Sequence, residues 1–219
     1  DLLPWEFRAR LAAKSVAYLP LGTLEWHGEH LPLGGDAIQS EGLMVECAMR
    51  FGEIVVPPIH FGPDRAWDRG AGEMLQGMDY ADSTDPHRRL DGSCYWVSDG
   101  VFALLVDALL VQIKRAGFKM VFADGHGPSR RAWCEAMPER EKRFDLKLAG
   151  VSEEVASEWK SQVDHAGQAM MNAATGDSPR PAHHQRCADP RVVDGTFGPR
   201  KWLAVVSQKD HQRVLETAP

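Results

Sequence analysis

Short apolar runs of strand length alternate with segments of helix length along the chain, and this alternation constrains the fold most. Residues 15–22, SVAYLPLG, form an apolar run that ends in glycine, as a buried strand does. Residues 36–52 follow with apolar side chains at near-helical spacing, and Gly52 is a helix stop signal. The next run, EIVV, is β-branched and leads into two prolines, which predicts a strand that ends near Val56.

The same alternation continues in the middle of the chain. Residues 98–118 predict a helix that ends at Gly117. The apolar face expected to be buried consists of Val101, Leu104, Leu105, Ala108, Leu109 and Ile113. The following residues, KMVFADGHG, read as a strand and a glycine-rich turn. The order β-loop-α-β-α-β predicts an α/β fold with a mostly parallel sheet covered by helices.

Composition bounds the class of protein. The chain has 219 residues, enough for one domain over residues 1–219 with its own core, and no apolar run reaches membrane-span length. The net charge is -6 and no basic stripe is present, so we expect neither nucleic acid nor a membrane as a partner. Four scattered cysteines favour reduced thiols, and residues 1–10 lack a signal-peptide pattern, so we expect a cytoplasmic protein.

Two loops rich in histidine and carboxylate follow predicted strands. Glu25, His27 and Asp36 lie in LEWHGEHLPLGGD, and His126 lies in DGHGPS. The carboxyl ends of parallel strands meet at one edge of a sheet, where ligands gather, and these side chains are the usual ligands of zinc, manganese or iron. The alternatives are a chance E-x-H spacing and an incidental solvent-exposed histidine in a glycine-rich turn.

A third candidate segment is DHAG at residues 164–167, with Asp164 beside His165. A histidine near an activated water can carry a proton to a leaving nitrogen, which would make this pair catalytic. The alternative is a surface histidine at a helix start.

Taken together, these segments resemble the creatininase (creatinine amidohydrolase) family. Its signature loop, approximately P-x-G-S-x-E-Q-H-G-x-H-L-P-L-x-T-D, is similar to residues 19–36, LPLGTLEWHGEHLPLGGD. Further similar segments follow in the family's order, and WEF and DPRVVDGTFG resemble its outer landmarks. These segments are PPIHFG at 57–62, GFKMVFADGHGPS at 117–129 and VDHAG at 163–167. The resemblance spans nearly the whole chain.

The resemblance implies a three-layer α/β/α sandwich with a divalent metal centre of one or two ions, usually two, of zinc, manganese or iron. It also implies hydrolysis of a C–N bond in a cyclic or linear amide by metal-activated water, and a homo-oligomer, often a hexamer. Carried over by position, Glu25, His27, Asp36 and His126 match metal ligands, with Asp36 in the bridging position. His165 matches the catalytic histidine that protonates the departing nitrogen, with Asp164 beside it.

The chain departs from the family pattern at the metal centre. Family members supply one more glutamate, and the two positions where it occurs hold Pro128 and Met170 here. The candidates to complete the shell are Gln168, Glu29, Glu73 or a water, and the alternative is a single ion with open coordination. Asp124, Ser129 and Trp26 also differ from the pattern, so creatinine itself is not the expected substrate.

Two other functions compete with amide hydrolysis of this kind. One is a degenerate family member that binds a small ligand or a protein partner without turnover, and the other is formamide, peptide or lactam hydrolysis at the same centre. Residues 63–86 are expected to form a long loop or lid. Apolar side chains in 64–91, among them Trp67 and Tyr80, are candidates for substrate recognition or for covering the sheet edge or a subunit contact.

Overall fold

Four parallel strands form the central sheet of the computed structural model, which describes residues 2–27, 32–80 and 86–151. The strands are β1 (Val16–Leu21), β2 (Ile54–Val55), β5 (Met120–Gly125) and β6 (Lys147–Gly150), in the order β2-β1-β5-β6. In β1 and β5, Val16 pairs with Met120 and Leu21 with Gly125, so the two strands end side by side. The predicted parallel sheet and the three strands expected from the apolar runs are confirmed.

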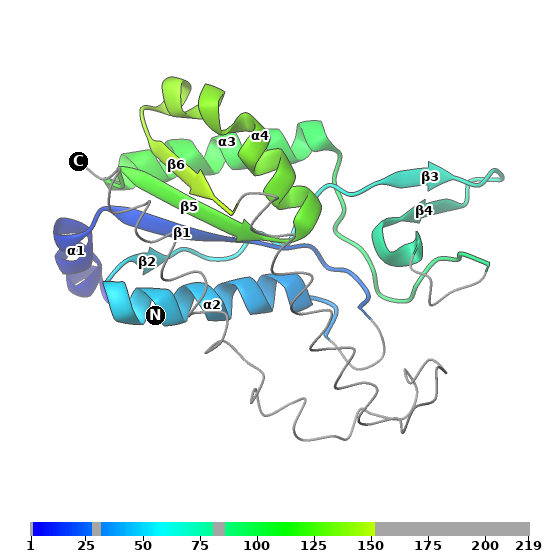
Figure 1. Ribbon diagram of the computed structural model, residues 1–219, viewed down its shortest axis with the longest axis horizontal. Helices are drawn as coiled ribbons and strands as arrows, with labels where there is room; N and C mark the ends of the chain where they lie inside the picture. The colour runs from blue at the N-terminus through cyan, green and yellow to red at the C-terminus, as the bar shows by residue number, and fades with distance from the viewer. Residues whose placement is uncertain (1, 28–31, 81–85, 152–219) are drawn as a thin grey trace, which may run out of the picture.

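Helices cover both faces of this sheet, which confirms the α/β fold (Figure 1). The helices are α1 (Pro4–Ala13), α2 (Gly35–Phe51), α3 (Asp99–Ala116) and α4 (Gly127–Phe144). One face carries α2, and the opposite face carries α3 and α4. Helices α2 and α3 end at the predicted glycines, Gly52 and Gly117. No helix in the described ranges is long and apolar enough to cross a membrane.

The strands bury side chains on both faces because helices lie on both sides. Alternate β1 residues, such as Leu19 and Leu21, pack in the cluster that holds Phe102, Val106 and Trp133 of α3 and α4. The intervening Tyr18 packs on the α2 side instead, with Met44, Cys47 and Ala48. Each large apolar side chain removed from water stabilises the fold by roughly 1.5–3 kcal/mol.

The buried face of α3 differs from the predicted one. Phe102, Val106, Leu110 and Ile113 face the sheet, whereas Val101, Leu104, Leu105, Ala108 and Leu109 are exposed. Of the predicted face, only Ile113 is buried. The prediction was wrong because α3 is apolar around most of its circumference, so periodicity does not select one face.

Residues 63–86 were expected to form a long loop or lid. The structure differs, because part of this segment has regular secondary structure. It contains an antiparallel hairpin of β3 (Ala66–Asp68) and β4 (Met74–Gln76), followed by the 3₁₀ helix η1 (Gly77–Tyr80). This hairpin projects from the sheet near the ends of its strands (Figure 1). Its strands have three residues each, and all three residues of β3 are exposed, so no alternation of buried and exposed side chains marks them in the sequence.

Candidate metal centre

The paired ends of β1 and β5 set the geometry of the centre. The His126 N–H donates a hydrogen bond to the Leu21 carbonyl at 2.9 Å. Gly125 has a φ of 144°, and a Cβ there would lie 1.8 Å from the Leu21 oxygen, so only glycine permits this approach. His126 therefore enters the site directly from the end of β5, close to Glu25, which follows β1.

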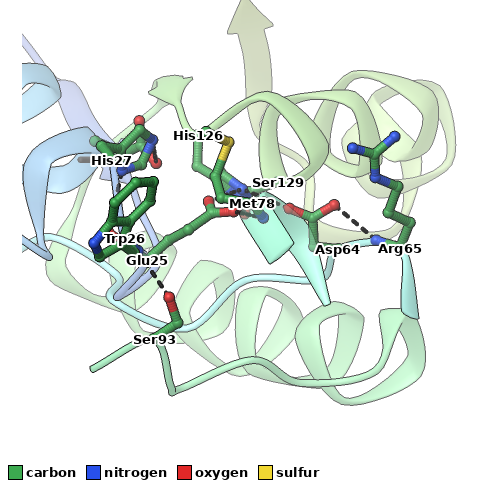
Figure 2. A network of polar contacts seen from close by, with 10 residues as sticks. Glu25, Trp26, His27, Asp64, Arg65, Met78, Ser93, His126 and Ser129 are labelled. Carbon is green, nitrogen blue, oxygen red and sulfur yellow. Dashed lines mark hydrogen bonds and ion pairs between the residues drawn. The ribbon is translucent and has the colours of Figure 1, made fainter. Parts of the chain in front are cut away.

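Glu25, Asp64 and His126 form the first group of possible ligands, which we call the deep cluster. The Nε2 atom of His126 lies 3.4 Å from Glu25 Oε2 and 3.4 Å from Asp64 Oδ2 (Figure 2). The side chains of His126, Glu25 and Asp64 are 4%, 3% and 12% exposed. Two carboxylates thus converge on one buried imidazole.

Glu25, His27 and Asp36 form the second group, the outer cluster. His27 Nε2 lies 3.6 Å from Asp36 Oδ2, and both side chains are 24% exposed. Asp36 stands in the first turn of α2, and the hydroxyl of Ser40 holds this end of α2 against β5 by donating to the Asp124 carbonyl at 2.6 Å. Glu25 belongs to both clusters, so its carboxylate lies between them.

Hydrogen bonds orient the ligand atoms. The Met78 N–H donates to Glu25 Oε1 at 2.6 Å, while Glu25 Oε2 faces His126 (Figure 2). His27 Nδ1 lies 3.1 Å from the Glu25 carbonyl, which only accepts, so Nδ1 carries a hydrogen and, in the neutral ring, Nε2 has the lone pair that a metal needs. His126 Nδ1 is bonded to Ser129 Oγ at 2.9 Å, which likewise leaves Nε2 facing the carboxylates.

The two clusters hold more carboxylates than imidazoles. Together they hold three carboxylates and two imidazoles. Burial lowers the pKa of His126, but the carboxylates of Asp64, Glu25 and Asp36 raise it more, to about 9. Burial raises the pKa of Asp36 above its usual value, although His27 and His126 act against this. A bound cation would stabilise these closely spaced, buried carboxylates in their charged form.

Two further observations fit a divalent metal. Asp36 Oδ2 is buried and forms no hydrogen bond with any residue that the structure describes. Gly77 has a φ of 57°, and a Cβ there would lie 2.4 Å from Glu25 Oε1 and 3.0 Å from Asp64 Oδ2. A side chain at position 77 would therefore fill the space beside the carboxylates. Imidazole nitrogens and carboxylate oxygens together suit zinc, manganese or iron.

The structure brings together the four residues predicted as ligands, Glu25, His27, Asp36 and His126. Their binding of a metal stays a prediction. Asp164 and His165 lie outside the described residues, as do Glu29, Gln168 and Met170. Glu73 is exposed in the hairpin and belongs to neither cluster.

Asp64 was not among the residues predicted as ligands. The segment that begins at this residue was predicted only to recognise substrate or to cover the sheet edge or a subunit contact. The signal that points to it is its position soon after the β2 run and its two prolines, at the same edge of the sheet as the other two loops.

The sequence matches a known protein family over most of its length. The family profile described as Creatininase, creatinine amidohydrolase, matches residues 2–185. The chain belongs to the creatininase family. A curated creatinine amidohydrolase of Pseudomonas putida is 34% identical over 77 residues, which are 34% of this creatininase-family chain and 30% of the relative.

Solved creatininase structures share the fold. The crystal structure of creatinine amidohydrolase has a TM-score of 0.55 at 20% identity, and the match covers 69% of this chain and 56% of that chain. The structure titled "Creatininase Mn" has a TM-score of 0.54 at 19% identity, covering 72% of this chain and 61% of that one. A variant creatininase titled "Zn-Zn type" gives 0.54 at 18% identity with the same coverage. The chain thus spans less than two thirds of the length of these relatives.

Proposed function

We propose that this protein is a metal-dependent amidohydrolase that cleaves a C–N bond of a cyclic or linear amide. The observation that carries the proposal is the pair of histidine and carboxylate clusters that share Glu25 at the carboxyl ends of β1 and β5. Membership of the creatininase family supports the reaction class. The titles of the neighbours that name Mn and Zn support the choice of ion.

In this proposal Glu25, His27, Asp36 and His126 hold one or two divalent ions. A divalent ion held there would lower the pKa of water and polarise the carbonyl of the amide. The chain's own groups set the orientation of the ligands: the Met78 N–H fixes Glu25, and Ser129 fixes the His126 ring. Burial of the deep cluster excludes water from one side, so substrate would approach from the side of the outer cluster.

Proton transfer to the leaving nitrogen is assigned to His165, with Asp164 beside it. This assignment rests on the resemblance of VDHAG to the family segment. Loss of this histidine should lower turnover while leaving the bound metal in place, because a general acid does not need to be a ligand.

We further propose that the substrate is a small amide other than creatinine, and that the protein is a cytoplasmic homo-oligomer. Trp26 stands where glutamine is common in the family, immediately beside Glu25. Its backbone N–H donates to Ser93 Oγ at 2.8 Å, which fixes the chain at this residue. A large aromatic ring at this position changes the shape and polarity available to a substrate.

A second candidate function is a family member that binds a small ligand or a protein partner without turnover. The observation that favours it is Pro128 and Met170 at the positions of the usual extra glutamate. Formamide, peptide and lactam substrates remain alternatives for an active centre of the same kind.

Elemental analysis and a substrate screen test the proposal. Purified protein reconstituted with Mn²⁺ or Zn²⁺ should retain metal and hydrolyse at least one compound among cyclic amides, formamides and short peptides. Asp36→Asn and His126→Ala should each lower metal content and hydrolysis, whereas the exposed control Asp68→Asn should not. Unchanged metal content and hydrolysis in both site variants would show that the centre is assigned wrongly. Metal retention without hydrolysis would favour the binding function.

A further inference from the structure

Asp64 lies in the deep cluster but outside the family pattern of metal ligands described above. Its Oδ1 atom accepts a hydrogen bond from the Arg65 N–H at 2.7 Å, while its Oδ2 atom lies 3.4 Å from His126 Nε2. One oxygen is thus anchored to the backbone, and the other faces the imidazole. This is the arrangement that a preorganised carboxylate ligand adopts.

Asp64 supplies a carboxylate to a centre that lacks the family's additional glutamate. Family members place an additional glutamate either two residues after the glycine-loop histidine or a few residues after H-A-G. This chain has Pro128, which has no ligand atom in its side chain, at the first position and Met170 at the second. Asp64 reaches the same histidine, His126, from a different loop. Asp64 therefore brings a carboxylate from another segment of the chain to a centre that lacks the one at position 128.

We propose that Asp64 is a metal ligand that replaces the glutamate lost at Pro128, and that it thereby ties the β3–β4 hairpin to the metal centre. The proposal deepens and rests on the proposed metal-dependent function. It gives the centre five protein ligands: Glu25, His27, Asp36, Asp64 and His126. This number suits two ions that share a carboxylate.

The hairpin is connected to the centre at both of its ends. Asp64 precedes β3, and Met78, whose N–H binds Glu25, follows β4. The Gly77 N–H donates to the Arg65 carbonyl at 3.0 Å and closes the base of the hairpin between these two points. A metal bound to Glu25 and Asp64 would therefore hold both ends together.

Aromatic side chains lie next to the base of the hairpin. The ring of Trp67, which is 55% exposed, stacks on Tyr80 with centroids 6.2 Å apart, and the Arg65 guanidinium lies 4.7 Å from the centre of the Tyr80 ring. Because Arg65 adjoins Asp64, metal occupancy would fix these side chains relative to the centre. Bound metal would then stabilise the hairpin further in the position that contacts substrate.

Metal titration of Asp64→Asn tests the ligand directly. The substitution keeps the shape of the side chain and removes its charge, so the variant should bind one Mn²⁺ ion at least about tenfold more weakly than the wild type. Asp68→Asn, on β3 of the same hairpin, is the matched control and should bind as the wild type does. Wild-type stoichiometry and affinity in Asp64→Asn would overturn the proposal.

A second variant tests whether Asp64 and the family glutamate are equivalent. The double variant Asp64→Asn with Pro128→Glu should recover the metal affinity lost in Asp64→Asn alone. A double variant no better than Asp64→Asn would refute replacement of the lost glutamate.

Two measurements on the wild-type chain remain decisive if Asp64→Asn does not fold. In wild-type crystals soaked with Mn²⁺ or Zn²⁺, anomalous density should lie about 2.0–2.2 Å from an Asp64 oxygen. Hydrogen exchange of residues 66–76 should slow when metal is added to the wild type. Bound metal away from Asp64 would overturn this inference alone, whereas a wild type that takes up no metal would overturn the proposed function as well.

Discussion

The deep and outer clusters share Glu25 but are built differently. The deep cluster comes from the ends of paired strands and is almost fully buried, with Glu25 and His126 at 3% and 4% exposure. The outer cluster joins a loop to the first turn of α2, and His27 and Asp36 are each 24% exposed. Backbone pairing fixes the first, and the docking of a helix fixes the second.

The difference in burial indicates different roles for the two clusters. A buried cluster offers a metal little access to solvent, so we expect it to hold its ion more tightly and to position the shared carboxylate. A partly exposed cluster leaves room for water and substrate at its ion, as open coordination at a catalytic metal requires.

Glu25→Gln should have the largest effect because it changes both clusters at once. We expect loss of both ions and of any hydrolysis, a larger effect than the roughly 10- to 100-fold weakening seen when a hydrogen-bond partner of a ligand is removed. Elemental analysis after dialysis measures it. The exposed Glu73→Gln is the control. Retention of one ion by Glu25→Gln would mean that one cluster binds metal without the shared carboxylate.

His27→Ala should remove one ion and leave the other. His27 contacts only the outer cluster, so the deep cluster keeps its ligands. Isothermal titration with Mn²⁺ should give two sites in the wild type and a single, tight site in the variant. Equal weakening of both sites would show that the two clusters act as one centre.

Ser129→Ala should weaken metal binding by roughly 10- to 100-fold without removing a ligand, because the hydroxyl holds the His126 ring in place. Its effect should fall on the tighter of the two sites in the same titration. Ser98→Ala is a matched control. It removes the N-cap of α3, which costs about 1 kcal/mol of stability, and should leave metal affinity unchanged.

Metal uptake should release a proton at neutral pH. The pKa of His126 in the metal-free protein is about 9, so its ring is protonated at pH 7.5, whereas a ligand must be neutral. Affinity should therefore rise by about tenfold per pH unit up to about pH 9 and then level off. Calorimetry in two buffers of different ionisation enthalpy counts the proton, and a zero count at pH 7.5 would contradict the assigned role of His126.

The parts of the fold predicted from sequence are those in which local patterns and tertiary packing agree. The strands near residues 16–21 and 120–125 are short apolar runs, and α2 and α3 end at glycines, so each is marked within its own sequence. The buried face of α3 and the β3–β4 hairpin were not predicted. Helix α3 has apolar residues on most of its surface, and the hairpin strands have too few to form an alternating pattern. Neither sequence therefore identifies the buried side.

At the candidate site, too, the residues predicted from the sequence are those that a local motif marks. Glu25, His27, Asp36 and His126 were identified because they lie in dense motifs at strand ends, and the structure brings them together. Asp64 lies 39 positions from Glu25 along the chain and outside any motif, and it reaches the cluster because β2 pairs with β1. In the sequence its position after the β2 run points only to the same sheet edge, and the three-dimensional arrangement shows the contact with His126.

The contact at Gly125 has a consequence for how this chain can change over evolution. The two strands that lead into Glu25 and His126 meet there through main-chain atoms, with the His126 N–H bonded to the Leu21 carbonyl. The spacing between the two loops therefore does not depend on the side chains that the loops carry. Residues that select a substrate can be exchanged one by one while the distance across the centre stays constant, so long as this one position remains a glycine.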